Sequence, residues 1–141
     1  MCTVHTTVCT KWSATPIIWY SKRQNTFEAS IFGSYFVALM VATEMVEALC
    51  YKLRCFGVPA EGPAEVFCDN KSVVKNSSIP ISVLNKIHNY ICYHRLREAQ
   101  SAGVFRFGWI PGEFNLADLF TNTTMPGNTR HTLVGSILYN T

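Results

Sequence analysis

The chain has 141 residues, 48% of them hydrophobic, and a mean hydropathy of +0.12, a composition typical of a folded domain and not of a disordered segment. Polar residues interrupt every apolar run well before the ~20 residues that a membrane-spanning helix needs. The composition therefore argues against a membrane span or a signal peptide and predicts an intracellular protein, cytoplasmic or nuclear and not secreted. The formal net charge of +3 is compatible with a phosphate-bearing partner but does not require one.

Residues 3–10 and 16–21 are rich in β-branched and aromatic side chains, and the segment between them contains turn-forming residues. This pattern predicts an antiparallel hairpin. From Phe32 to Leu53, apolar residues recur in steps of three and four, with Thr43 as the one polar residue of the series. That spacing indicates one face of a long helix, and the Gly-Val-Pro segment after it marks its end.

Residues 64–68 are typical of a buried strand, and either Asp69 or Asn70 can cap the helical turn that follows. Residues 82–100 predict a second long helix, and residues 104–110 alternate as in a strand.

Residues 111–115 form a predicted loop before Asp118, and residues 123–141 predict a polar turn plus a short C-terminal helix. The chain, residues 1–141, thus predicts one domain of the α/β class, in which an antiparallel hairpin leads into parallel strands. Carboxylates at the C-terminal ends of such strands lie where open sheets usually place their chemistry.

Six cysteines are scattered without a Cys-x-x-Cys pair, which favours buried thiols over disulfides or a zinc ribbon. One combination invites a zinc hypothesis, namely His88, Cys92 and His94 on one helix together with Cys68. Its spacing fits no standard set of zinc ligands. Partly buried side chains with other partners are the favoured interpretation.

Four blocks of the chain resemble, in order and spacing, the ribonuclease H domain that ends the polyprotein of copia-type LTR retrotransposons. The blocks are IIWYSKRQNTFEASIFGSYFVAL, VFCDNKSVVKN, LNKIHNYICYHRLREA and FGWIPGEFNLADLFT, and they cover about residues 15–122. The resemblance implies a ribonuclease H-like mixed sheet flanked by helices. It also implies an endonuclease that uses two Mg²⁺ ions to cut the RNA strand of RNA–DNA hybrids during reverse transcription. A reverse transcriptase domain upstream in a polyprotein is the implied partner.

The family holds its metal ions with four carboxylates, since Mg²⁺ prefers hard oxygen ligands. The resemblance places Asp69 and Asp118 at the third and fourth positions, and Tyr35 at the second, where the family has Glu. The first position has no counterpart, because the family's central first strand is missing. A neutral phenol is a poor Mg²⁺ ligand, and neither Glu44 nor Glu47 lies on the helix where it could replace the missing carboxylate. We therefore expect weak or single-ion Mg²⁺ binding by the two aspartates, and impaired catalysis.

A basic cluster on the second helix is expected to contact the phosphates of the hybrid, with a solvated helix face carrying Arg–Glu pairs as an equal alternative. Its members are Lys86, His88, His94, Arg95 and Arg97. The three tryptophans, Trp12, Trp19 and Trp109, are expected to pack in the core or at strand edges and not to stack on bases.

The sequence thus favours a truncated copia-type ribonuclease H domain that is catalytically impaired. Two alternatives stay open. One is a non-catalytic ribonuclease H-like module for nucleic-acid binding or scaffolding, which Tyr35 favours. The other is a decayed transposon fragment without a function of its own.

Overall fold

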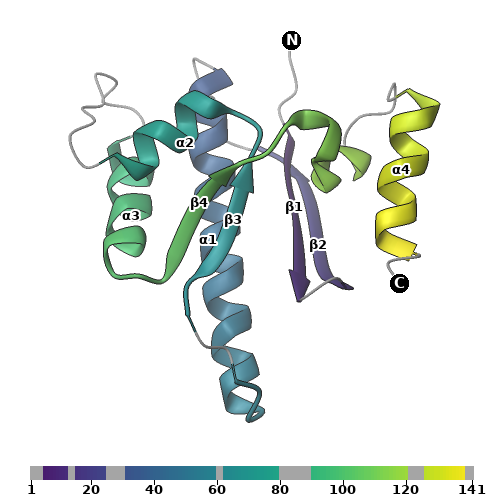
Figure 1. The fold of residues 1–141 in the computed structure, drawn as a ribbon. Coiled ribbons are helices and arrows are strands. Elements are labelled where there is room, and N and C mark those ends of the chain that lie inside the picture. Colours follow the sequence, from purple (N-terminus) through teal and green to yellow (C-terminus); the bar gives the residue numbers. More distant parts are fainter. Residues whose placement is uncertain are drawn as a thin grey trace. The chain divides into compact units, whose positions relative to one another are not determined.

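The computed structural model describes most of the chain, and its elements are drawn in Figure 1. The described residues are 5–12, 15–24, 31–59, 62–79, 90–120 and 126–138. Contacts between Cα atoms divide the chain into two compact units. The terminal unit comprises residues 1–27 and 110–141, and the central unit comprises residues 28–109. The organisation into one domain stays a prediction, and each unit is described by itself.

The terminal unit begins with the predicted hairpin, which is confirmed. Strands β1 (His5–Trp12) and β2 (Thr15–Arg23) pair antiparallel, with Val8 opposite Tyr20 and an irregularity in the register after Thr10. Val8 is buried whereas most of β2 is exposed, so this two-stranded sheet contributes little to a core.

The rest of the terminal unit is helical. The short 3₁₀ helix η2 (Gly112–Phe114) lies within the predicted loop over residues 111–115, and a second one, η3 (Leu116–Phe120), follows it and contains Asp118. Helix α4 (Gly127–Leu138) confirms the predicted closing helix. Both β1 and α4 contact η3, which places η3 at the centre of this unit.

The central unit begins with the long helix α1 (Ile31–Cys55), as the apolar spacing predicts. The polar Thr43 is fully buried in the middle of the apolar stripe, and its hydroxyl donates a hydrogen bond to the carbonyl of Leu39 at 2.8 Å. A buried hydroxyl is tolerated when it is paired in this way. The C-terminal half of α1 extends beyond the sheet of the same unit (Figure 1).

Helix α1 ends in a glycine cap. Gly57 has a φ of 75°, a backbone conformation that glycine adopts without strain. Its N–H donates to the carbonyl of Arg54 at 3.0 Å, and the N–H of Val58 donates to the carbonyl of Leu53 at 2.9 Å. This pair of hydrogen bonds is the Schellman motif, which satisfies carbonyls that the helix end would leave unpaired.

The sheet of the central unit consists of β3 (Ala64–Cys68) and β4 (Phe105–Trp109), which pair in parallel, with Cys68 opposite Trp109. Parallel strands need a crossover connection, and here helices α2 (Lys71–Ser78) and α3 (Tyr90–Ser101) lie between them in the chain. Both strands were predicted. The first half of the predicted helix over 82–100 lies outside the described residues.

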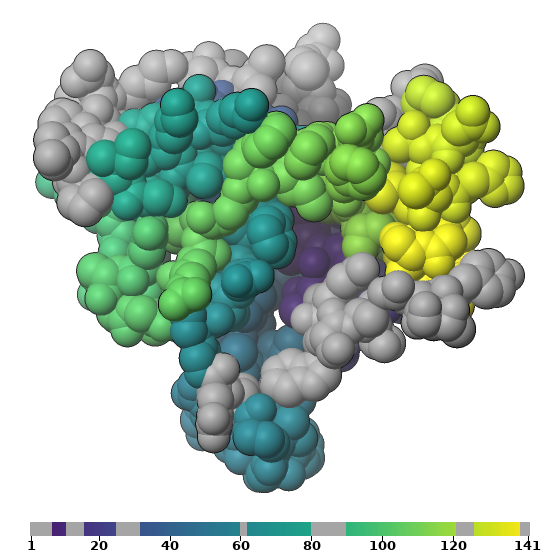
Figure 2. All heavy atoms as spheres, in the orientation of Figure 1, coloured from purple at the N-terminus to yellow at the C-terminus, as the bar shows by residue number. Residues whose placement is uncertain are grey.

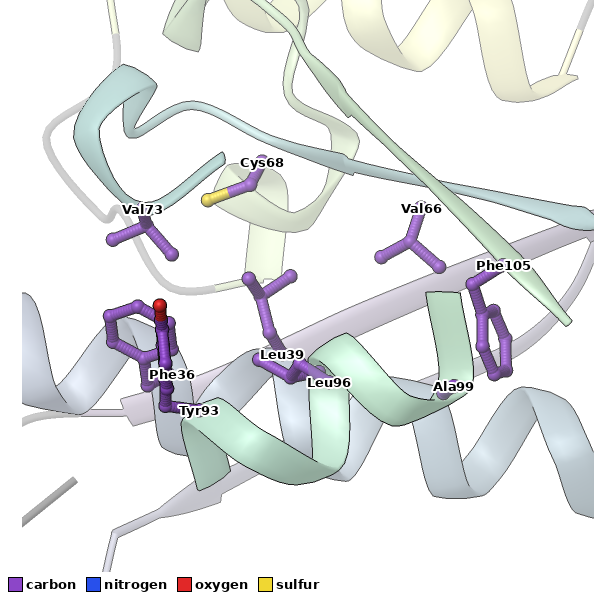
Figure 3. Packing of buried hydrophobic residues seen from close by; sticks show 9 residues of the cluster. All are labelled: Phe36, Leu39, Val66, Cys68, Val73, Tyr93, Leu96, Ala99 and Phe105. Carbon is purple, nitrogen blue, oxygen red and sulfur yellow. The ribbon is translucent and has the colours of Figure 1, made fainter. Parts of the chain in front are cut away.

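The core of the central unit lies between one face of this sheet and the helices. Alternate residues of β3 are buried there, whereas Glu65 and Phe67 on the other face are exposed. Figure 3 shows the side chains of α1, α2, α3 and both strands converging on this region. The buried cluster comprises Phe36, Leu39, Val66, Cys68, Val73, Tyr93, Leu96, Ala99 and Phe105.

The α/β class is therefore confirmed. Among the described residues the strands form two separate two-stranded sheets, one antiparallel and one parallel, and not one mixed ladder. The ribonuclease H-like arrangement of these elements stays a prediction. No helix in the described part of the chain is long and apolar enough to span a membrane.

Candidate functional site at the end of strand β3

The residues after β3 decide which of two side chains, Asp69 or Asn70, caps α2. The side-chain oxygen of Asn70 accepts hydrogen bonds from the backbone N–H groups of Ser72 at 3.1 Å and Val73 at 3.3 Å. Asn70 is therefore the N-cap of α2, in the extended conformation that caps adopt. Asp69 precedes the cap, so its carboxylate is not needed to start the helix.

Asp69 lies where β3 and β4 end side by side. The indole Nε1–H of Trp109 donates to the backbone carbonyl of Asp69 at 2.9 Å, which ties the ends of the two strands together. Asp69 is half-buried. Its carboxylate has no hydrogen-bond or ion-pair partner within the described segments, so it is available to a ligand at the C-terminal edge of the sheet.

The side chain of the neighbouring Cys68 is not available to a ligand in this way. Its side chain is buried in the core, and burial raises the pKa of the Cys68 thiol from 9.0 to about 11, opposed by a hydrogen bond from the N–H of Asn70 and aided by the charge of Asp69. The thiol therefore stays protonated at neutral pH, whereas metal binding needs the thiolate.

Cys92 and His94, which with Cys68 and His88 invite the zinc hypothesis, are described on α3. Cys92 packs against the core cluster, and the ring of His94 lies 4.0 Å from that of Tyr90, measured between centroids. His88 lies outside the described residues. Elsewhere in the described ranges, no three His, Cys, Asp or Glu side chains group together as metal ligands would.

Asp118 lies in the terminal unit, within η3. Its backbone N–H donates to the carbonyl of Asn115 at 3.1 Å, and one carboxylate oxygen accepts from the side-chain amide of Asn115 at 3.5 Å. The side-chain oxygen of Asn115 in turn accepts from the N–H of Ala117 at 3.1 Å. Asn115 therefore organises the turn that presents the half-buried Asp118.

Tyr35, which the resemblance aligns with a Glu, lies on α1 and packs against the core cluster as a half-buried side chain. Of the two acids further along α1, Glu44 is exposed and Glu47 is engaged by Arg95. The donor set is thus one carboxylate in the central unit, one in the terminal unit, and a phenol. Two carboxylates and a neutral phenol do not fit a two-ion magnesium site, which needs more carboxylate ligands.

The predicted basic cluster is described only in part, because Lys86 and His88 lie outside the described residues. One guanidinium nitrogen of Arg95 donates to both carboxylate oxygens of Glu47, at 2.8 and 3.1 Å, and Glu98 lies 3.7 Å from another of its nitrogens. Arg97 donates to the hydroxyl of Tyr93 at 2.6 Å and lies over its ring. Both guanidinium groups are therefore held by protein groups, and the prediction that they contact phosphates stays a prediction.

Trp19 and Trp109 are more exposed than packing in the core would require, and the side chain of Trp12 lies outside the described residues. Trp19 is 62% exposed and Trp109 is 42% exposed. The ring of Trp19 lies parallel to that of Phe120, with centroids 6.3 Å apart, and the Lys71 ammonium lies 4.0 Å from the centroid of Trp109. Sequence reasoning missed the Lys71–Trp109 contact, because it depends on the register that sets Trp109 opposite the last residue of β3.

No model of a known protein family matches the chain. No solved structure matches it significantly. The family resemblance therefore depends on the four sequence blocks alone.

Proposed function

We propose that this chain is a ribonuclease H-like domain of retrotransposon descent that binds RNA–DNA hybrids and is impaired in cutting them. The observation that carries the proposal is the position of Asp69. It directly follows β3, a strand of a parallel pair with one face in the core, and Asn70 takes over the capping role that would otherwise explain it. Its carboxylate is thus placed at the edge where parallel sheets usually place ligand-binding groups.

The impairment follows from the residues that would hold magnesium. Hydrolysis by two metal ions needs carboxylates that bridge and flank both ions. Of the family's four positions, this chain supplies acids at two, Asp69 and Asp118, while Tyr35 offers a neutral phenol at a third. One weakly held Mg²⁺ is the most that two carboxylates support.

Cleavage of a labelled RNA–DNA hybrid, with Mg²⁺ and with Mn²⁺, tests this proposal. We expect no cleavage by the chain or by Tyr35→Glu. We expect cleavage by Tyr35→Glu after a first strand carrying its Asp has been added to the chain. Tyr51→Glu, on the same helix but 70% exposed, is the matched control and should stay inactive with the added strand. Far-ultraviolet circular dichroism must show that each variant folds, because Tyr35 packs against the core.

Cleavage by the unmodified chain that Asp69→Asn abolishes would contradict the impaired site. Failure of the doubly repaired chain to cleave, although folded, would contradict the descent from an active ribonuclease H.

A non-catalytic binding or scaffolding module is the second candidate, and the packing of Tyr35 against the core favours it, because the side chain serves the fold there. This module would bind a hybrid duplex in EDTA as well as in Mg²⁺. A decayed fragment would instead be poorly soluble and unfold without cooperativity. The buried cluster of the central unit argues against decay.

A further inference from the structure

Helix α2 carries two exposed lysines, which do not pack in the core. Lys71, Ser72 and Lys75 are exposed, whereas Val73 and Ser77 face the interior. Lys71 and Lys75 are four residues apart, so they lie on the same side of the helix, ~6 Å apart along its axis. The helix contains no acidic residue. In Figure 2 the α2 region forms part of the visible surface of the molecule.

These lysines differ from the arginines of α3 in what surrounds them. Arg95 is paired with Glu47, and Arg97 with Tyr93. Lys71 and Lys75, in contrast, have no carboxylate partner in the described part of the chain. A cation that is already paired must lose that partner to bind a phosphate, so the lysines of α2 are the better available donors.

The contact with Trp109 fixes one of these cations in place. The Lys71 ammonium lies over the indole ring, and the indole N–H is bonded to the carbonyl of Asp69. A cation over an aromatic face is held by the ring's charge distribution while its remaining N–H groups stay in water. Lys71 is therefore held beside Asp69, at the edge of the sheet where the proposed function places the nucleic acid.

We propose that α2 binds the phosphate backbone of a nucleic-acid duplex through Lys71 and Lys75, with Trp109 holding Lys71 in position. This inference rests on the proposed function, which supplies the RNA–DNA hybrid as the ligand. Two cations one helical turn apart, without a neighbouring acid on the helix, fit a ligand with regularly spaced negative charges. Each ammonium contacts a different phosphate of one strand.

The test compares the binding of a labelled RNA–DNA hybrid by the whole chain and two variants, measured by fluorescence anisotropy in EDTA over a series of salt concentrations. The test variant is Lys71→Gln with Lys75→Gln. The control is Lys22→Gln with Lys52→Gln, which removes the same charge from two other exposed lysines, on β2 and α1. Because each phosphate contact contributes about 0.9 to the slope of log affinity against log salt, the test variant should lose about 1.8 of that slope and bind about tenfold more weakly. The control should bind within about twofold of the unmodified chain, since it removes no phosphate contact.

A second readout reports on Trp109 itself. In a Trp12→Phe, Trp19→Phe chain, Trp109 is the only tryptophan, and a phosphate that binds Lys71 above the indole alters the charge next to the ring and should change its emission. Binding that is unchanged in the α2 variant, or that leaves the Trp109 emission unchanged, would overturn this inference and leave the proposed function standing. Failure of the unmodified chain to bind the hybrid at low salt would overturn both.

Discussion

The two compact units differ in how much apolar surface they bury. Among the described residues, ten of the buried apolar side chains belong to the central unit, and two, Val8 and Leu133, belong to the terminal unit. Both units expose large apolar side chains, which in the terminal unit include Ile17, Trp19, Phe114 and Phe120. The only described sheet of the terminal unit is a two-stranded hairpin, and such hairpins are marginally stable alone.

The difference follows from how each unit is built. In the central unit, two parallel strands need helical crossovers, and these helices cover one face of the sheet. The apolar stripe of α1 adds a further layer. In the terminal unit, only two residues separate β1 from β2, so their connection carries no helix over the hairpin. The central unit should therefore supply most of the free energy of unfolding.

Truncation of one large aromatic side chain in each unit tests this directly. Phe36→Ala removes a side chain that is 0% exposed and should lower the free energy of unfolding by about 3–5 kcal/mol, as core aromatic truncations do. Trp19→Ala, at 62% exposure, should cost no more than about 1 kcal/mol, mostly from its contact with Phe120. Urea unfolding followed by circular dichroism measures both. Similar costs would remove the distinction between the units.

The pH dependence of the free energy of unfolding tests whether water reaches the Cys68 thiol in the core of the central unit. Because the pKa of the Cys68 thiol is about 11 in the folded protein and about 9 without the fold, the folded state holds the proton more tightly. Its contribution is complete below pH 9 and is lost as the pH rises toward 11. The loss should reach about 1 kcal/mol at pH 10.

The control for this prediction is Cys68→Ala, whose free energy of unfolding should be offset by a constant amount and fall less steeply between pH 8 and pH 10. Parallel profiles for the two proteins would show that the thiol is hydrated, contrary to its burial at 7% exposure.

The N-cap of α2 should make the next largest contribution to the stability of the central unit. Asn70→Ala removes the acceptor for the N–H groups of Ser72 and Val73 and should cost about 1 kcal/mol. Asn70→Asp keeps an acceptor and should stay close to the unmodified chain. Urea midpoints of the three proteins measure the effect. Equal losses in both variants would show that the amide group, and not capping, is what matters there.

The ion pair between α1 and α3 should contribute less. The side chains of Arg95 and Glu47 are 37% and 31% exposed, so solvent screens the attraction, and we expect a coupling free energy of about 0.5 kcal/mol. A double-mutant cycle with Glu47→Ala and Arg95→Ala measures it by urea unfolding. The same cycle with Glu44, which is exposed on the same helix, should give no coupling. A coupling above about 2 kcal/mol would place this pair among the main supports of the unit.

Periodicity predicts elements well where one face of an element is buried. The stripe of α1, the hairpin and the strands β3 and β4 all follow from the order of apolar and polar residues, and Gly57 marks a helix end because it alone fits that backbone. Pairing between distant strands does not follow from local order, so the sequence could not show that the strands form two sheets.

In the candidate site, too, the sequence predicts positions within one element but not contacts between distant elements. Asp69 was predicted from its position after an apolar run, and the structure adds that Asn70 is the cap. The engagement of Arg95 by Glu47 joins residues 48 positions apart in the chain, and the contact of Lys71 with Trp109 depends on the register of two strands. Interactions of this kind appear only once the elements are placed together.

The outer face of the central sheet provides the finest test of the comparison, because it is exposed like the strands of the terminal unit. A Cβ atom at Gly108 would lie 2.8 Å from the ring of Phe67 on the neighbouring strand. That ring is 56% exposed and can turn into solvent, so Gly108→Ala should change the free energy of unfolding by less than about 0.5 kcal/mol. Gly103→Ala is the control and should cost about 1 kcal/mol, because Gly103 has a φ of 69° at the end of α3. If Gly108→Ala costs more than Gly103→Ala in urea unfolding, the Phe67 ring is held against the strand. This face of the central unit would then be packed like its interior, unlike the exposed hairpin of the terminal unit.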